Sequence, residues 1–147
     1  MKTIFNDRDF SALYARAEAL KPDAPLQWGG MNVAQMLAHA NRTIELGLGV
    51  VTAPSESNIF LRWLIKPLAV GSAPIKKNSP TSKAMRITEE KDFQAEKLKL
   101  LENLLAAKAR GLNGNWQPHI AFGPLTPEQW GTLTYKHLDH HLQQFSA

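Results

Sequence analysis

The sequence predicts an all-α protein, a four-helix bundle with a long crossover between the second and third helices. In four separate stretches, apolar residues recur at the three- and four-residue spacing of an amphipathic helix, and no stretch shows the alternation of a half-buried strand. About 40 residues separate the second stretch from the third, far more than an antiparallel helix pair needs. We therefore expect the second and third helices to run roughly parallel.

The first helix is expected at residues 7–20. Asn6 or Asp7 can cap it, because both side chains accept hydrogen bonds from the free backbone N–H groups of a first turn. The apolar positions that define the helix are Phe10, Leu13, Tyr14, Ala17 and Leu20. A proline-rich break follows before the next helical pattern.

The second helix is expected at residues 33–48. Asn32, followed three residues later by Gln35, has the pattern of a capping box, in which each side chain bonds the other residue's backbone N–H. Gly47 and Gly49 are the two alternatives for the end of this helix, since glycine commonly terminates helices.

The third and fourth helices are expected at residues 90–111 and from Thr126 onward. Gly111 is a natural stop for the third helix. Its apolar side is expected to consist of Phe93, Leu98, Leu101, Leu104 and Leu105. For the fourth helix, Thr126 is followed by Pro127 at the first helical position and by Gln129 three residues on, which is a strong start signal.

The crossover, residues 50–90, is the least regular part of the chain. Four prolines interrupt it, namely Pro54, Pro67, Pro74 and Pro80. Within it, the apolar run "NIFLRWLIKPLAV" at 58–70 carries only Arg62 and Lys66 as charged residues. We favour a short helix packed over the bundle, with a lid and a membrane-surface anchor as the alternatives.

Composition excludes several kinds of site. With no cysteine, the chain has no disulfide, no cysteine-based zinc site and no thiol nucleophile. The net charge of +4 is uneven: residues 60–110 hold 11 Lys/Arg against 5 Asp/Glu, and the remainder holds 6 against 8. Because acidic residues interleave with the basic ones and no aromatic strip accompanies them, we expect a solvated helix face and no nucleic-acid partner. An anionic ligand is the alternative, and its candidate contacts are Lys76, Lys77, Lys83 and Arg86.

We expect residues 1–147 to form one domain, because this length can bury a core of ordinary size. Asp7 and Asp9 stand where a signal peptide would need apolar residues, and no segment has the length of a membrane span. These features predict a cytoplasmic protein with no membrane partner.

The C-terminal stretch "YKHLDHHLQQF" at 135–145 holds three of the five histidines. At 100° per residue, His137 and His141 lie one turn apart on the core-facing side of the fourth helix, while His140 and Asp139 point outward. An i, i+4 histidine pair can bind one metal ion, although a third ligand is normally required. The pair therefore indicates either part of a metal site or two structural histidines.

A third ligand would come from another part of the chain. His39 is the only other histidine inside an expected helix, and it lies on a flank that can face a neighbouring helix. His119 ranks below it, because the helix from Thr126 to His137 is about 16 Å long and the His119 loop would have to fold back over that length. In the structural alternative, the paired histidines hydrogen-bond each other, Tyr135, Glu45 or a buried water.

Two segments resemble the DinB/YfiT-like superfamily: "MNVAQMLAHANRT" at 31–43 and "HIAFGPLTPEQWGTLTYKHLDHHLQQF" at 119–145. They are most similar to an uncharacterised bacterial family within it that carries Gln-Met-Leu-x-His in helix two and Tyr-Lys-His-x-x-His-His-x-x-Gln-Phe near the C-terminus. The resemblance implies a four-helix bundle that binds a divalent metal, zinc or nickel, through His39, His137 and His141, with His140 outside the ligand set. One departure is the sequence from His119 to Gly123, which lacks the proline of the family's His-Pro-Phe-Phe-Gly.

The resemblance also implies a class of activity. Characterised members of the superfamily include metal-dependent transferases and isomerases that use a low-molecular-weight thiol as cosubstrate, so we expect a small-molecule substrate and a thiol cosubstrate. No catalytic acid or base is identified, and His119, His140 and residues 76–86 are left without a role. The alternative is a non-catalytic bundle with structural histidines that acts as a homodimer or binds a partner.

Overall fold

The computed structural model describes all residues, 1–147, and is entirely helical. Its five α-helices are α1 (Asp7–Ala19), α2 (Val33–Leu48), α3 (Lys66–Val70), α4 (Phe93–Arg110) and α5 (Pro127–Gln144). A π-helical turn at Leu61–Ile65 precedes α3, and a 3-10 turn at Lys83–Met85 lies between α3 and α4. The only strand-like feature is an isolated bridge between His119 and Gly123. The predicted all-α class is confirmed.

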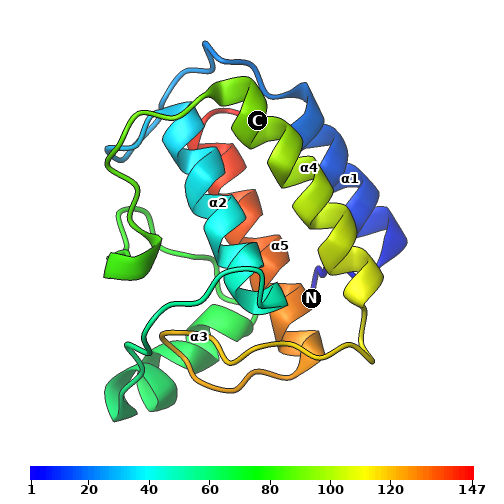
Figure 1. Cartoon of the computed structure of the whole chain (residues 1–147), viewed down its shortest axis with the longest axis vertical. Coiled ribbons are helices and arrows are strands. Elements are labelled where there is room, and N and C mark those ends of the chain that lie inside the picture. The colour runs from blue at the N-terminus through cyan, green and yellow to red at the C-terminus, as the bar shows by residue number, and fades with distance from the viewer.

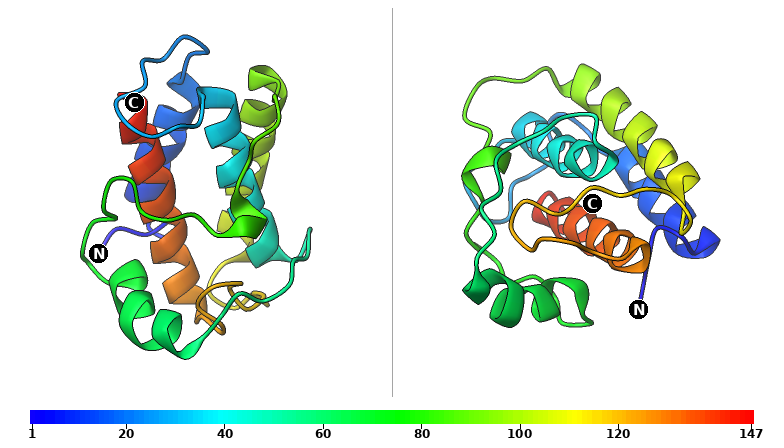
Figure 2. Two further views of the ribbon diagram at one scale, coloured as in Figure 1. Left: turned by 90° about the vertical axis from the view of Figure 1, so that its left-hand side faces the viewer. Right: turned by 60° about the horizontal axis from the view of Figure 1, so that its bottom comes forward.

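The four long helices form a bundle with two pairs of parallel neighbours, α1 with α5 and α2 with α4 (Figure 1). α2 packs against α4 and α5, and α1 packs against the same two helices. In the view of Figure 1, α1 and α5 run upward while α2 and α4 run downward, so the predicted parallel arrangement of the second and third long helices is confirmed. The connection between them crosses the face formed by α2 and α5 (Figure 2).

The predicted capping residues begin the helices. Asn6 accepts a hydrogen bond from the Asp9 backbone at α1, and complete capping boxes start at Asn32 for α2 and at Thr126 for α5. Such caps satisfy backbone N–H groups that have no partner within the helix. At the end of α2, Gly49 adopts φ of 77°, a left-handed conformation that glycine accepts without strain.

α2 continues through Gly47 because this glycine makes room for a tryptophan. Trp130 of α5 lies against Gly47, and a Cβ atom there would come within 2.8 Å of the indole ring. The indole is almost fully buried and donates its N–H to the carbonyl of Gln117. Of the two expected helix ends, Gly49 is therefore the correct one, and Gly47 serves helix packing.

The buried face of α4 differs from the expected one. Leu100, Leu104 and Ala107 are fully buried and spaced by three and four residues, whereas Leu98 and Leu105 are exposed. The prediction that Leu98 and Leu105 belong to the apolar side is thus wrong. α4 packs between α1 and α2, so only the narrow stripe that points between these two helices is covered.

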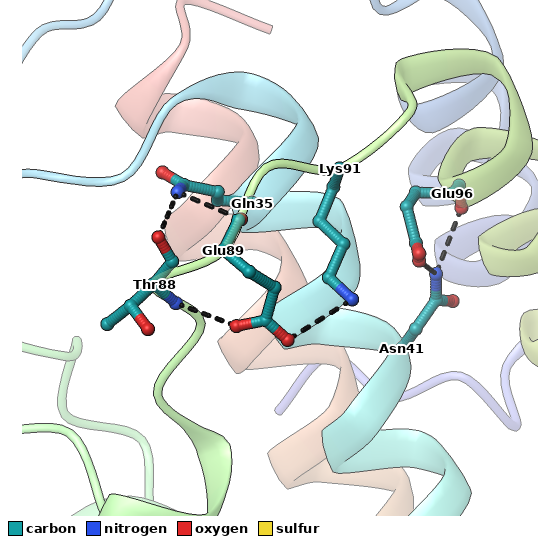
Figure 3. Close-up of polar contacts among 6 residues, drawn as sticks. All are labelled: Gln35, Asn41, Thr88, Glu89, Lys91 and Glu96. Carbon is teal, nitrogen blue, oxygen red and sulfur yellow. Dashed lines mark hydrogen bonds and ion pairs between the residues drawn. The ribbon is translucent and has the colours of Figure 1, made fainter.

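A polar network joins the parallel helices α2 and α4. The buried Asn41 donates to the backbone carbonyl and the carboxylate of Glu96, both at 2.9 Å (Figure 3). Asn103 donates to Asn41 and to Glu45, whose carboxylate also pairs with Lys99 at 3.0 Å. Because every buried member has a partner, this network costs little and orients α4 on α2.

The last part of the crossover is attached to the first turn of α2. Gln35 donates to the backbone carbonyls of Thr88 and Glu89, and the Glu89 carboxylate pairs with Lys91 (Figure 3). Gln35 therefore completes the capping box and also holds the incoming chain just before α4.

The apolar run at 58–70 lies against the bundle mainly through backbone groups. Lys66 donates to the Pro124 carbonyl at 2.8 Å, and Lys136 of α5 donates to the carbonyls of Leu68, Ala69 and Gly71. Its large apolar side chains, in contrast, are exposed: Ile59, Phe60, Trp63, Leu64 and Leu68. The expected packing of this run over the bundle is correct for its backbone and wrong for these side chains. No helix of the structure is long and apolar enough to cross a membrane.

Substitution of the two adjacent leucines Leu104 and Leu105 tests the corrected face of α4. Leu104 is 0% exposed and Leu105 is 51% exposed. We expect Leu104→Ala to lower the free energy of unfolding by about 2–5 kcal/mol through lost burial and a cavity. Leu105→Ala should change it by less than about 0.5 kcal/mol. Urea unfolding followed by circular dichroism measures both, and equal losses would contradict the assigned face.

Candidate metal centre

Three imidazole rings converge between α2 and α5. The Nε2 atom of His137 lies 2.9 Å from Nε2 of His39 and 3.2 Å from Nε2 of His141. α2 contributes one ring, and α5 contributes the other two from positions one turn apart. His39, His137 and His141 thus offer one ligand atom each, all within 4.8 Å of one another. The structure brings together the three residues expected from the sequence.

The second nitrogen of two rings is held by an oxygen acceptor. His39 Nδ1 donates to the backbone carbonyl of Met85 at 2.7 Å, and His141 Nδ1 donates to the Gln144 side-chain oxygen at 2.9 Å. Gln144 is itself oriented, since its amide nitrogen donates to the Trp28 carbonyl at 2.7 Å. With the proton on Nδ1, both neutral rings present the lone pair of Nε2 toward His137.

This donor set fits a metal ion better than it fits hydrogen bonds alone. A proton on Nε2 of His137 can point at His39 or at His141, so one of the two contacts would bring lone pairs together. A cation at the centre would accept all three lone pairs at once. In a tetrahedral zinc site with bonds of about 2.0–2.1 Å, the nitrogen atoms lie about 3.3 Å apart. The two separations around His137 are close to this value, and the ligand atoms of His39 and His141 lie within 4.8 Å of each other. The residues present therefore fit a divalent metal.

The electrostatic environment keeps these rings neutral. Burial lowers the pKa of His39, and burial together with the neighbouring rings lowers the pKa of His141 to about 3. The same causes, burial first and then repulsion from His141 and His39, hold the pKa of His137 well below its ordinary value. Neutral imidazole is the form that binds metals, so the site is prepared for a ligand role at neutral pH.

The three rings differ in how far they are covered. His39 is 3% exposed and His141 is 9% exposed, whereas His137 is only partly buried. A separate hollow of about 190 Å³ lies between α2 and α4 and does not include the histidines; its charged lining is Arg42, Glu45, Lys91, Glu96 and Lys99.

His140 and Asp139 stand outside the cluster, as expected from the helical spacing. The His140 ring lies edge-on to Trp28 at 5.6 Å, and the ammonium of Lys77 covers the Trp28 ring at 4.3 Å. Asp139 pairs with Arg16 of α1 and accepts from Gln143, so its carboxylate links helices. The other basic candidates, Lys76, Lys83 and Arg86, are exposed.

His119 holds a turn and does not reach the cluster. Its Nδ1 accepts from the backbone N–H groups of Ala121 and Phe122, and its ring stacks on Phe122 at 4.6 Å. His119 and Gly123 exchange two backbone hydrogen bonds of 2.8 Å, with Gly123 at φ of 71°. The loop is thus well defined without the proline expected from the resemblance. Burial lowers the pKa of His119 to about 4.

Sequence reasoning did not assign the acceptors that hold Nδ1 of His39 and His141. Gln144 follows His141 by three residues, so the helical spacing could have indicated its contact. The contacts of Met85 and Trp28 carried no signal in the sequence, because both depend on where loops distant in the chain come to lie. Tyr135 and Glu45, considered as partners of the histidines, do not bond them; Glu45 instead bonds Asn103 and Lys99.

A family model described as "Protein of unknown function (DUF1569)" matches residues 5–147. Because the match covers nearly the whole chain, the chain belongs to this family. Comparisons with curated proteins and with solved structures found no match. The family description assigns no activity, so the chemistry of the histidine cluster carries the functional argument.

The structural role assigned to His119 predicts a pH dependence of stability. Folded His119 has a pKa of about 4, against 6.5 for an ordinary histidine, so the unfolded state binds the proton more readily. The contribution of neutral, buried His119 to the free energy of unfolding is fully present above pH 6.5 and is lost as the pH falls toward 4. Between pH 7 and pH 5, we expect wild-type protein to lose about 2 kcal/mol more unfolding free energy than His119→Asn. Urea unfolding with a chelator measures this difference, and identical losses would contradict the burial argument.

Proposed function

We propose that this protein is a metal-dependent enzyme of the DinB/YfiT-like superfamily and that His39, His137 and His141 hold a catalytic divalent ion, zinc or nickel. The observation that carries the proposal is the convergence of three Nε2 atoms while oxygen acceptors hold Nδ1 of His39 and His141. Acceptors of this kind set the tautomer and orientation of metal-binding histidines. The resemblance of the two histidine-bearing segments to that superfamily adds support.

Three neutral protein ligands favour a catalytic role over a purely structural one. Structural zinc sites usually have four protein ligands, whereas catalytic sites have three and leave a position open. A divalent ion held in this way lowers the pKa of a bound water or thiol, or polarises a carbonyl. The open position would lie beside His137, the one ligand side chain of the three that is only partly buried.

The reaction that we favour is displacement by a low-molecular-weight thiol on a small electrophile: the thiol loses its proton, its sulfur bonds the electrophilic carbon, and the bond from that carbon to the leaving group breaks, with the electron pair departing on the leaving group. The chain contains no cysteine, so a sulfur nucleophile has to come from a cosubstrate. No carboxylate serves as an obvious base, since Glu45 and Asp139 are engaged by Asn103, Lys99 and Arg16. The nucleophile would then be activated mainly by the ion, and the chain would position the ion through Met85 and Gln144.

One observation favours a second candidate, a bundle that acts by binding a partner. The crossover presents a group of exposed apolar side chains that includes Trp63 and Ile59. Such a face is typical of an interaction surface, and it is compatible with structural histidines. Metal content followed by assays of thiol transfer separates the two candidates.

Metal analysis of untagged protein purified without chelator tests the ligand set directly. We expect about one equivalent of divalent metal in the wild type by mass spectrometry, because the three ligands define one site. His39→Ala and His141→Ala should both lose it, whereas His140→Ala should retain it because His140 lies outside the cluster. Circular dichroism checks that each variant is folded. No metal in the wild type, and no uptake of added zinc or nickel, would refute the enzyme proposal.

Two adjacent glutamines test the support given to His141. The Gln144 side chain accepts a hydrogen bond from His141 Nδ1, whereas the side chain of the exposed Gln143 donates to Asp139. We expect Gln144→Ala to weaken zinc affinity about 10–100-fold, as loss of such an acceptor typically does. Gln143→Ala should leave the affinity unchanged. Competition with a chromophoric chelator measures both, and equal affinities for the two variants would show that the Gln144 contact is irrelevant to the metal.

A further inference from the structure

The crossover combines exposed apolar side chains with an excess of positive charge. Residues 57–88 contain no aspartate or glutamate. Their basic residues are Arg62, Lys66, Lys76, Lys77, Lys83 and Arg86. Since the whole chain has a net charge of +4, this segment is more basic than the rest of the molecule, which is net acidic.

The apolar side chains of the segment are turned away from the bundle. Trp63 is 76% exposed and Ile59 is 77% exposed, and Phe60, Leu64 and Leu68 are more than half exposed. Lys136 binds three carbonyls at the end of α3, and Lys66 binds the Pro124 carbonyl, so polar contacts hold the segment. The crossover runs along one side of the bundle (Figures 1 and 2). No neighbouring part of the bundle buries the side chains of these five residues.

We infer that this face docks on the surface of an anionic lipid membrane. Helices that lie in a membrane interface bring aromatic and aliphatic residues to the acyl boundary and lysine or arginine to the headgroups. Trp63 and Phe60, with the neighbouring aliphatic residues, supply the first component. The exposed Lys76, Lys83 and Arg86 supply the second, while Lys77 lies over the Trp28 ring, and each basic residue near such a surface strengthens attraction to acidic lipids.

Charge argues against a second copy of the chain as the occupant. A two-fold symmetric contact brings the same patch of both subunits together. Two segments, each with six basic residues against the one carboxylate of Glu56 that is bound at Ser82 and Ala84, would then face each other with a large excess of positive charge. The inference departs from the expectation of no membrane partner, because exposure of the apolar run is visible only in the structure. It does not depend on the metal or on the proposed reaction.

Co-sedimentation of the full-length protein with vesicles tests the inference. We expect pelleting with vesicles of phosphatidylglycerol mixed with phosphatidylcholine, little pelleting with phosphatidylcholine alone, and weaker pelleting at high salt. Trp63→Ser should weaken binding about tenfold or more through lost apolar burial. The double variant Lys76→Glu/Lys83→Glu should weaken it by a similar factor through charge reversal.

Matched controls separate this face from general effects. Leu98→Ser removes an exposed leucine on α4, and Lys21→Glu reverses an exposed charge outside the crossover; neither should change binding by more than about twofold. Absence of pelleting with anionic vesicles would overturn the inference, and so would equal pelleting with both vesicle types. Light scattering that shows a wild-type dimer, and a Trp63→Ser monomer, would instead assign the face to a second copy.

Discussion

The structure depends on satisfying three imidazole rings that are buried, wholly or in part, between α2 and α5. A buried polar ring needs partners for both nitrogens, and here two rings find them in opposite directions. Their Nδ1 atoms bond Met85 of the crossover and Gln144 of α5, while their Nε2 atoms meet at His137. The contact between α2 and α5 is therefore built around polar groups at this level, although the hydrophobic core of the bundle includes leucines and Trp130. Without the Met85 carbonyl the His39 ring would lose the hydrogen bond that fixes its orientation, and without the Gln144 oxygen the same would hold for His141.

The crossover follows from the parallel arrangement of α2 and α4, because parallel neighbours need a chain that returns along the full length of the bundle. This return path performs two tasks. Its 3-10 turn places the Met85 carbonyl on His39, and its α3 end is held by Lys136, the residue before His137. The same segment carries the exposed apolar and basic residues, so the proposed membrane face and the histidine cluster share one connecting element. A movement of the crossover would therefore shift the Met85 carbonyl and change the orientation of the His39 ring.

The five histidines illustrate how the surroundings assign different roles to one residue type. His119 accepts two backbone hydrogen bonds, stacks on Phe122 and lies tilted against Trp130, which explains a structural role without any metal. His140 borders Trp28 at the edge of the cluster. Only the remaining three bring their Nε2 atoms together, which is the arrangement that a divalent cation would satisfy. Burial and a lowered pKa are common to His119 and the three clustered histidines. The property that distinguishes the candidate centre is therefore the convergence of three Nε2 atoms.

The sequence by itself determined the four long helices, the caps of three of them and the two faces of α5, because these depend on contacts between residues within a few positions of each other. Asn32 and Thr126 begin helices as expected, and His137 and His141 share a face by helical geometry alone. It also indicated His39 as the third member, through its place in α2 and the resemblance of two segments. Only the tertiary structure decided which leucines of α4 are buried, that the apolar run at 58–70 points outward, and that Met85 and Gln144 orient the rings. These properties arise where segments distant in the chain meet, and hydrophobic spacing does not say which neighbour, if any, covers a given face.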